Sequence, residues 1–483
     1  MNLVPVNSVS GQHFETIIIG TGFGSSFYLH EARRYGLQPT LVVDWGQFHP
    51  HDWQVEQKRN SATAVSDTFN SESSKVWNYT IGFGGGMNCW FAQTPRFHPT
   101  DFQLASRYGI GQDWPITYDE LEPYYAEAEE IMSISGDPDM ARIMPRSRDF
   151  PQPPHNLTTA DQLMKRAQPD RHFAMPTARA RVATSTRSAC CASLRCQLCP
   201  VDAKFTAQNG FPGLYDDPAV KLCLGTRALH FVTAGDRVTE LVVEHEGREY
   251  RLHADRFILG ANAIQSPAIL LNSGMESPLT GAGLHESYGF SVEVFLDGLD
   301  HFNGSTITTG INYSLYDGDH RRDTAAALVY FENRWTYGLR REPGKHRWSL
   351  PVTIVTEDLL QPENRVLSKA ATPQPVPTIA YGDASDYARR GADRALRLLP
   401  EVLKPLPVEA IHFRGYRPTE SHLQGTLRMG RTPDDSVVDA DQIHHRWRNL
   451  TVVGTSVFPS CSCANPSLTV AALSLRAARL AVA

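Results

Sequence analysis

The stretch FETIIIGTGFGSSFYLHEARRYGLQPTLVVDWG, residues 14–46, decides the expected fold. It opens on a continuous apolar run, FETIIIG, as expected for a strand that is buried on both faces. A glycine-rich turn then leads into an amphipathic segment that Gly36 closes, and PTLVVDWG predicts a second buried strand. The sequence therefore predicts a strand–helix–strand unit close to the N-terminus.

The turn of this unit is rich in glycine. Gly20, Gly22 and Ser25 give the spacing G-x-G-x-x-S, one residue short of the dinucleotide fingerprint. Gly20 permits a tight turn, Gly22 lets the backbone approach a pyrophosphate, and Ser25 is small enough for close helix–strand packing. Asp44, at the end of the second strand, can accept hydrogen bonds from a ribose. We expect a dinucleotide here; a glycine turn without a ligand is the alternative.

A second glycine cluster, IGFGGGMNCW at residues 81–90, follows some way along the chain. The first turn alone does not distinguish NAD from FAD. A second glycine-rich contact suits a long, extended cofactor that touches the chain repeatedly, and therefore favours FAD. A flexible loop is the alternative interpretation of this cluster.

Bulk composition narrows the class of protein. A chain of 483 residues predicts two or three domains, and a net charge of −6 argues against nucleic-acid binding. The N-terminus lacks a basic region followed by an apolar one, so no secretory signal is expected. No apolar run reaches the roughly 18 residues of a membrane span. A cytoplasmic location without a membrane span is the default expectation, and eight cysteines are too few for a disulfide scaffold.

The remaining elements are expected to mix helices and strands. A helix is predicted from Tyr118, antiparallel strands within 220–262, further strands within 300–370, and a helix over 386–403. The C-terminal part returns to a buried strand, NLTVVGTS, and an apolar helix. Aromatic residues between Phe331 and Trp348 are expected to form one face of a sheet, or a surface on which a sugar stacks.

Four separated motifs resemble the glucose–methanol–choline (GMC) oxidoreductases. They are GGGMNCWFAQTPRFHPTDF, DWPITYDELEPYYAEAE, RFILGANAIQSPAILLNSG and SHLQGTLRMGRTPDDSVVD, the last followed by NLTVVGTSVFPSCSCANPSLTVAALSLRAA. The resemblance implies an α/β fold with a Rossmann-like FAD-binding domain, beside a substrate domain built on an antiparallel sheet. It also implies oxidation of an alcohol by hydride transfer to the flavin. The segment with GGGMNCW is most similar to the sugar-oxidising branch, which includes pyranose oxidase and bacterial FAD sugar dehydrogenases.

This resemblance divides the chain into five expected segments. The FAD-binding domain is expected to be discontinuous. It is interrupted first by a surface excursion that contains the cysteine-rich segment, and then by the substrate-binding domain. The expected order is 10–130 (FAD), 131–200 (excursion), 201–285 (FAD), 286–415 (substrate) and 416–483 (FAD, with the catalytic residues).

Two residues carry the expected chemistry. Oxidation of an alcohol needs a base for the hydroxyl proton, and a neutral imidazole with a pKa of about 6.5 suits that role. The catalytic histidine of the family falls on His422, in SHLQGTLRMG. The family places a second histidine or an asparagine at Asn465, where it bonds the substrate hydroxyl. Asn465 also suits a helix N-cap, with Pro466 as the first helical residue.

Further residues are expected to hold FAD through this resemblance. Besides Gly20, Gly22, Ser25 and Asp44, they are Gly24, Gly85, Gly86, Asn88, Cys89, Gly454, Thr455, Pro466 and Thr469. Cys89 falls where pyranose oxidases carry a histidine bonded covalently to FAD. A small buried neighbour of the flavin is the preferred interpretation of Cys89, and a thioether link is the alternative.

The segment ACCASLRCQLCP, residues 189–200, holds Cys190, Cys191, Cys196 and Cys199. Only Cys196 and Cys199 have zinc-like spacing, and a bridge between the adjacent Cys190 and Cys191 would be strained. The spacing resembles the segment that carries a [3Fe-4S] cluster in bacterial FAD sugar dehydrogenases. An iron–sulfur cluster and a thiol-rich loop without metal both stay open.

The expected activity is FAD-dependent oxidation of an alcohol, with a sugar or glycoside as substrate. A lyase of the same family, working without net oxidation, is one alternative, and a non-catalytic FAD protein is another. The electron acceptor is expected to be a quinone, a cytochrome or O₂, and a dehydrogenase is favoured over an oxidase. Relatives with an iron–sulfur cluster work with a small partner subunit, so export to the periplasm with that partner is the alternative location.

Overall fold

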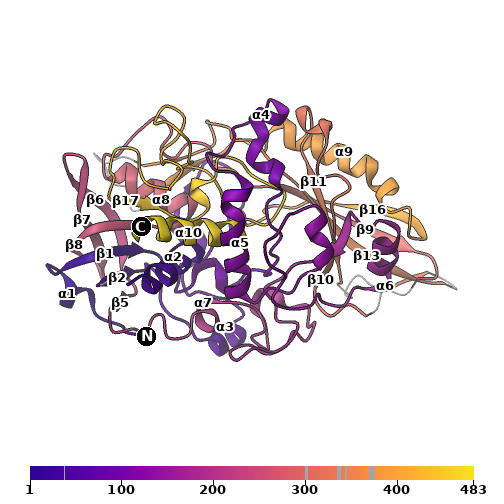
Figure 1. The fold of residues 1–483 in the computed structure, drawn as a ribbon, viewed down its shortest axis with the longest axis horizontal. Helices are drawn as coiled ribbons and strands as arrows, with labels where there is room; N and C mark the ends of the chain where they lie inside the picture. Colours follow the sequence, from indigo (N-terminus) through magenta and orange to yellow (C-terminus); the bar gives the residue numbers. More distant parts are fainter. Residues whose placement is uncertain (37–38, 300–302, 334–338, 343–344, 369–375, 483) are drawn as a thin grey trace.

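The computed structural model describes residues 1–36, 39–299, 303–333, 339–342, 345–368 and 376–482. Within these residues the chain forms two seven-stranded sheets and one three-stranded sheet, with helices around them. In Figure 1 the strands of the first sheet lie on the left and those of the second on the right, with both chain termini near the first sheet. The predicted α/β architecture is confirmed.

The first sheet is mainly parallel and contains the strand–helix–strand unit. Its order is β5-β2-β1-β8-β7-β6, and β17 also pairs with β8. Strands β1, β2, β5, β8 and β17 pair in parallel, whereas β6 and β7 form antiparallel pairs. The bounds are β1 His13–Ile19, β2 Thr40–Val43, β5 Val220–Cys223, β6 Arg227–Ala234, β7 Arg237–His245, β8 Arg248–Leu259 and β17 Leu450–Val452.

The second sheet is antiparallel throughout and forms the other half of the molecule. Its order is β16-β9-β13-β11-β10-β4, and β12 also pairs with β13. The bounds are β4 His172–Ala174, β9 Tyr288–Leu296, β10 Thr308–Asn312, β11 Ala327–Glu332, β12 Leu339–Glu342, β13 Lys345–Thr356 and β16 Val408–Tyr416. Phe331 is buried in this sheet; the aromatic residues at 334–338 lie outside the described residues, as does the side chain of Trp348.

A small third sheet and ten α-helices complete the described elements. The third sheet consists of β14 Arg365–Leu367, β15 Thr378–Ala380 and β3 Asn70–Ser71. The α-helices are α1 Val6–Val9, α2 Phe23–Arg34, α3 His51–Gln57, α4 Leu104–Tyr108, α5 Tyr118–Met132, α6 Thr159–Ala167, α7 Ala207–Gly210, α8 Asn262–Asn272, α9 Asp386–Val402 and α10 Ser467–Val482. None of the helices that the structure describes is long and apolar enough to cross a membrane.

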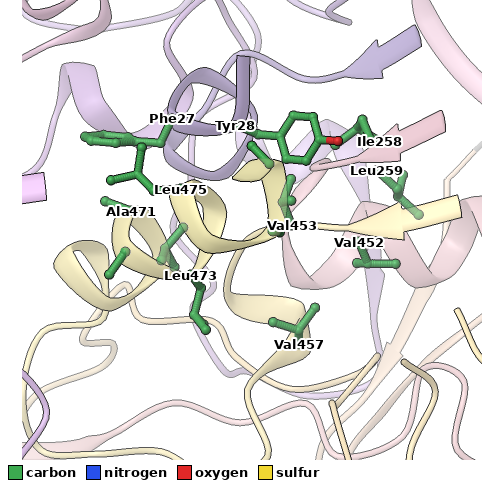
Figure 2. Packing of buried hydrophobic residues seen from close by; sticks show 14 of the residues in the cluster. Phe27, Tyr28, Ile258, Leu259, Val452, Val453, Val457, Ala471, Leu473 and Leu475 are labelled. Carbon is green, nitrogen blue, oxygen red and sulfur yellow. The ribbon is translucent and has the colours of Figure 1, made fainter. Parts of the chain in front are cut away.

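The N-terminal and C-terminal parts share one hydrophobic core. Helix α10 packs against α2 and against α5, although α2 and α10 lie at opposite ends of the sequence. Figure 2 shows Phe27 of α2 beside Leu475 of α10, with Val452 of β17 and Leu259 of β8 in the same cluster. These side chains are buried, so the parallel sheet is completed only by the end of the chain.

A separate core joins the second sheet to α9. Apolar residues of β9, β11 and β13 pack against Ala395 and Leu399 of α9, and α6 contributes Ala160 and Met164. Figure 1 shows α9 along the side of this sheet. Each sheet therefore has its own buried apolar layer, and the region between the two sheets can hold a cavity.

Candidate active site

A cavity of about 350 Å³ lies at the carboxyl ends of the parallel strands. Ligands of open α/β sheets bind at this edge, because the loops that follow the strands meet there. The cavity extends from the glycine turn after β1 to the second sheet. Of the site residues predicted from the sequence, those that line this cavity are Gly20, Gly22, Gly24, Asp44, Gly85, Gly86, Cys89, His422, Gly454, Thr455, Asn465 and Pro466.

The glycine turn fits tightly against neighbouring backbone. Gly20 has φ +91°, and a Cβ there would lie 2.6 Å from the carbonyl oxygen of Gly260. A Cβ on Gly24 would lie 2.8 Å from the amide nitrogen of Gly454. By contrast, a Cβ on Gly22 would meet no atom within 4 Å, so the backbone of Gly22 borders open space in the cavity. This surface can approach a pyrophosphate.

Thr21 joins the two glycine clusters to Asp44. The hydroxyl of Thr21 donates to Oδ2 of Asp44 at 2.6 Å and accepts from the amide of Gly84 at 2.8 Å. The amide of Gly46 donates to Oδ1 of Asp44 at 2.8 Å. Burial raises the pKa of Asp44, and the hydrogen bonds from Thr21 and Gly46 oppose that rise. Asp44 is thus oriented at the end of β2, facing the cavity.

The second glycine cluster lies directly beside the first. A Cβ on Gly85 would lie 3.2 Å from the Cα atom of Gly22. Gly86 and Cys89 also line the cavity, and the thiol of Cys89 lies 3.2 Å from the hydroxyl of Thr80. The two clusters, far apart in sequence, therefore border the same elongated cavity.

Three predicted cofactor residues lie next to the cavity rather than on its wall. Ser25 is buried, and its hydroxyl donates to the carbonyl of Ile19 at 3.1 Å, which ties the start of α2 to the end of β1. The side-chain amide of Asn88 donates to the carbonyl of Phe83. The hydroxyl of Thr469, in α10, lies 2.8 Å from that of Tyr125.

His422 and Asn465 meet at the other end of the cavity. Nδ2 of Asn465 lies 3.2 Å from Nε2 of His422, and both residues line the cavity. Nδ1 of His422 lies 3.1 Å from the hydroxyl of Ser287. The hydroxyl of Tyr330, on β11, lies 3.3 Å from Oδ1 of Asn465. The two nitrogens of His422 therefore have different partners, and Nε2 is the one that faces Asn465.

The environment of His422 differs from the expected one. We expected a pKa near 6.5, but burial lowers the pKa of His422 to about 3, and the positive charge of Arg417 adds to this effect. An imidazole with this pKa is neutral throughout the physiological range. His422 is therefore neutral, as expected, with a larger margin against protonation.

The prediction that Asn465 caps the last helix is wrong. Helix α10 begins at Ser467, and the carbonyl of Pro466 accepts from the amide of Val470 at 3.0 Å, so Pro466 occupies the capping position. Asn465 lies one residue earlier, and its side chain bonds His422 and Tyr330. The side-chain amide of Asn465 therefore faces His422 and the cavity and does not cap the helix.

Charged residues that the motifs did not reveal also line this end of the cavity. Arg417, Glu420 and Glu332 form part of the wall, with Nε of Arg417 3.0 Å from Oε1 of Glu420. Burial raises the pKa of Glu420, and Arg417 opposes that rise. The cavity wall near His422 is therefore polar and charged. Arg417 and Glu420 lie in the loop after β16, whereas Glu332 ends β11, and no local sequence pattern shows that they meet at one cavity.

The four clustered cysteines do not form the arrangement expected for a cluster site. Cys196 and Cys199 are buried, Cys190 is half-buried and Cys191 is exposed, and all four are free thiols. Among the residues that the structure describes, no group of three or more His, Cys, Asp or Glu side chains could hold a metal ion. The thiol of Cys199 accepts from the amide of Ala203 at 3.3 Å. A metal site on these cysteines is therefore not supported.

The parallel sheet with its glycine turn and the antiparallel sheet beside it define a Rossmann-like α/β fold with an added antiparallel sheet. The family model described as GMC oxidoreductase matches residues 363–474, which include His422 and Asn465. The chain is a relative of the GMC oxidoreductases, as its motifs indicated.

Curated relatives and solved structures support this relationship over nearly the whole chain. The large subunit of fructose dehydrogenase from Gluconobacter japonicus is 27% identical, over 96% of this chain and 97% of that protein. The 6'''-hydroxyparomomycin C oxidase of Streptomyces lividus is 27% identical, over 96% and 91%. Pyridoxine 4-oxidase from Mesorbium loti has the same fold, with a TM-score of 0.66 and 16% identity over 96% of this chain and 98% of that one.

Proposed function

We propose that this chain oxidises a hydroxyl group of a sugar or glycoside with FAD, and that His422 accepts the hydroxyl proton. The observation that carries the proposal is the single cavity that joins the glycine turn and Asp44 to the His422–Asn465 pair. The names of the relatives, a fructose dehydrogenase subunit and an aminoglycoside oxidase, support a carbohydrate substrate.

The described residues fit FAD. The open space at Gly22 and the neighbouring Gly85 leave room for a pyrophosphate against bare backbone. Asp44, fixed by Thr21 and Gly46, can accept from the ribose hydroxyls. Cys89 lies on the wall of the same cavity as Gly86 and would be among the residues that hold the cofactor. When bound, FAD would accept the hydride of the alcohol; we propose that Cys89 contacts it without a covalent bond.

The chain's own residues would bind and deprotonate the alcohol. Because His422 is neutral, the lone pair of Nε2 can accept the hydroxyl proton. When an alcohol is bound, the amide of Asn465 can donate to its hydroxyl oxygen in place of Nε2, which leaves the Nε2 lone pair free for the hydroxyl proton. The start of α10 follows Asn465 directly, and the positive end of its dipole stabilises negative charge nearby.

Anaerobic mixing with sugars and other alcohols tests this proposal. Loss of the oxidised flavin absorbance on mixing is expected for a substrate, and the spectrum would stay unchanged for a lyase. His422→Ala should slow this step by about 10² to 10⁴ while FAD stays bound. His13→Ala, at an exposed histidine far from the cavity, is the control. Undiminished flavin reduction in His422→Ala would contradict the assigned role.

Electron transfer from the reduced enzyme is a separate part of the proposal. Both dehydrogenases and oxidases occur among the relatives. We propose a dehydrogenase that passes electrons to a quinone or cytochrome, and a small partner subunit, because the fructose dehydrogenase relative is a large subunit. Turnover with a quinone compared with O₂, and co-purification of a second chain, test these points. Cell fractionation distinguishes the cytoplasm from the periplasm.

Because the cysteine-rich segment does not fit a metal, we propose FAD as the sole redox group. Iron analysis and electron paramagnetic resonance of protein purified without air are the test. Iron in stoichiometric amount would contradict this part of the proposal.

A further inference from the structure

The loop that carries His422 is bound to one buried carboxylate. Oε2 of Glu286 accepts from the hydroxyl of Thr419 at 3.0 Å, the amide of Glu420 at 3.3 Å and the amide of His422 at 3.2 Å. Glu286 is 3% exposed. Ser421, inside this loop, has φ +60°, which is unfavourable for a residue with a side chain. The three hydrogen bonds to Glu286 compensate for this conformation.

Lys75 balances the charge of Glu286. Nζ of Lys75 contacts Oε1 of Glu286, and it donates to the carbonyl of Pro418 at 2.9 Å. Lys75 is partly buried, with 18% of its side chain exposed. Glu286 therefore keeps one oxygen for Lys75 and one for the loop. The carboxylate acts as a clamp between the segment at residue 75 and the segment at residues 418–422.

The neighbouring Ser287 contacts the imidazole itself. Its hydroxyl lies 3.1 Å from Nδ1 of His422, and Ser287 is 3% exposed. On the other side of the ring, Nε2 lies 3.2 Å from the donor nitrogen of Asn465. A neutral imidazole carries its proton on one nitrogen only. With Nε2 accepting from Asn465, the proton is on Nδ1 and is donated to Ser287.

We propose that Glu286 and Ser287 are positioning residues for His422. Glu286 fixes the place of its backbone, and Ser287 accepts the proton on Nδ1, so that the lone pair of the ring is on Nε2, on the side of Asn465 and the cavity. The inference rests on the proposed function, in which Nε2 of His422 accepts the hydroxyl proton. Both residues directly precede β9, so the substrate-domain sheet orients a base that lies on the C-terminal segment.

The tautomer of His422 provides a test that needs no substrate. In protein labelled with ¹⁵N-histidine, the signals of His422 are those missing from His422→Asn. Shifts typical of a protonated Nδ1 and a bare Nε2 are expected in the wild type. Ser287→Ala should give a mixture of tautomers, because the acceptor for Nδ1–H is lost. Glu286→Gln should keep the wild-type tautomer. An unchanged tautomer in Ser287→Ala would overturn the role of Ser287.

Flavin reduction by a substrate provides the second test. Ser287→Ala should lower its limiting rate about tenfold, the equivalent of one hydrogen bond, with little change in KM. Ser287→Thr retains a hydroxyl and should restore most of the rate. Ser349→Ala, at a buried serine of β13 that bonds Glu293, is the matched control and should behave as wild type. Equal rates in Ser287→Ala and wild type would contradict the proposal.

Glu286 is tested by the same measurements. Glu286→Gln should lower the limiting rate while FAD and the tautomer are retained, since only the backbone clamp is weakened. A wild-type rate in Glu286→Gln would overturn its role. If no alcohol reduces the wild-type flavin, the proposed function fails, whereas the tautomer measurement still decides whether Ser287 holds the proton on Nδ1.

Discussion

The hydroxyl of Thr21 and the carboxylate of Asp44 lie 2.6 Å apart in a buried hydrogen bond, which links the loop after β1 to the end of β2. The same hydroxyl accepts from the amide of Gly84. One side chain thus aligns both glycine clusters with the residue that is expected to hold the ribose.

Removal of this hydroxyl should weaken cofactor binding. Thr21→Val keeps the shape of the side chain but breaks the bonds to Asp44 and Gly84. We expect an affinity for FAD that is lower by about tenfold or more, because two buried polar groups lose their partner. The measurement is FAD retained per protein after dialysis, followed by titration of the apoprotein.

The loss of FAD affinity should be specific to the position of Thr21. Thr309→Val, at a buried threonine of β10 that bonds Asp161, is a matched substitution in the other sheet. It should leave FAD affinity unchanged. Equal affinities of Thr21→Val and wild type would show that the link to Asp44 does not contribute to the site.

The rate of flavin reduction should not fall between pH 8 and pH 5 through protonation of His422. Because burial and Arg417 lower the pKa of His422 to about 3, the base stays neutral when the pH falls from 8 to 5. With the ordinary pKa of about 6.5, most of the base would be protonated at pH 5 and the rate would fall more than tenfold. Limiting rates of anaerobic reduction across this range distinguish the two cases.

Stability, by contrast, should fall on mild acidification. Burial lowers the pKa of five histidines. The pKa is about 3 for His422 and about 4 for His155, His285, His320 and His444. In the unfolded chain they titrate near pH 6.5, so the unfolded state binds more protons between about pH 6.5 and 4. Their contribution is complete above pH 6.5 and is lost progressively below it.

Calorimetric unfolding at pH 5.5, in buffers with different ionisation enthalpies, measures this proton uptake. We expect several protons to be taken up on unfolding and a lower melting temperature than at pH 7.5. Unfolding without proton uptake at pH 5.5 would contradict the neutral state of these histidines.

A buried ion pair should make a large contribution to stability. Arg96 is 1% exposed and binds Glu129 through two hydrogen bonds, of 2.8 Å and 2.9 Å. Arg96→Met leaves the buried Glu129 with less compensation and should cost about 3–5 kcal/mol of unfolding free energy. Arg148 pairs with Glu130 at 2.7 Å, but both side chains are about half exposed. Arg148→Met should cost less than about 1 kcal/mol. Similar losses in the two variants, measured by urea unfolding, would contradict this difference.

The sequence predicted those features that depend on neighbouring residues. Gly20, Gly22 and Asp44 form one local unit, and the motifs around His422 and Asn465 could be recognised without the fold. Strands β1, β2 and β17 and helices α5 and α9 were also predicted from their apolar patterns, whereas β5, in the stretch expected to be antiparallel, pairs in parallel with β2.

Features that depend on distant contacts could not be predicted. Ser287 lies 135 positions from His422 in the chain, and nothing near it indicates that the two side chains meet. The low pKa of His422 follows from its burial, which the tertiary structure decides. Asn465 preceding Pro466 is a typical capping pattern, but the bonds to His422 and Tyr330 take its place. The cysteine spacing left a cluster and a thiol-rich loop both open, and among the described residues no three such side chains are placed to hold a metal ion.

The packing of α10 against α2 has a consequence for synthesis of the chain. Helix α2 is made long before its apolar neighbours in α10 and before Arg479, which pairs with Glu31 of α2. While the ribosome is still translating, the N-terminal strand–helix–strand unit has an uncovered apolar face, which suits binding by a chaperone. The half of the molecule that contains the parallel sheet can therefore reach its final structure only after α10 has been synthesised.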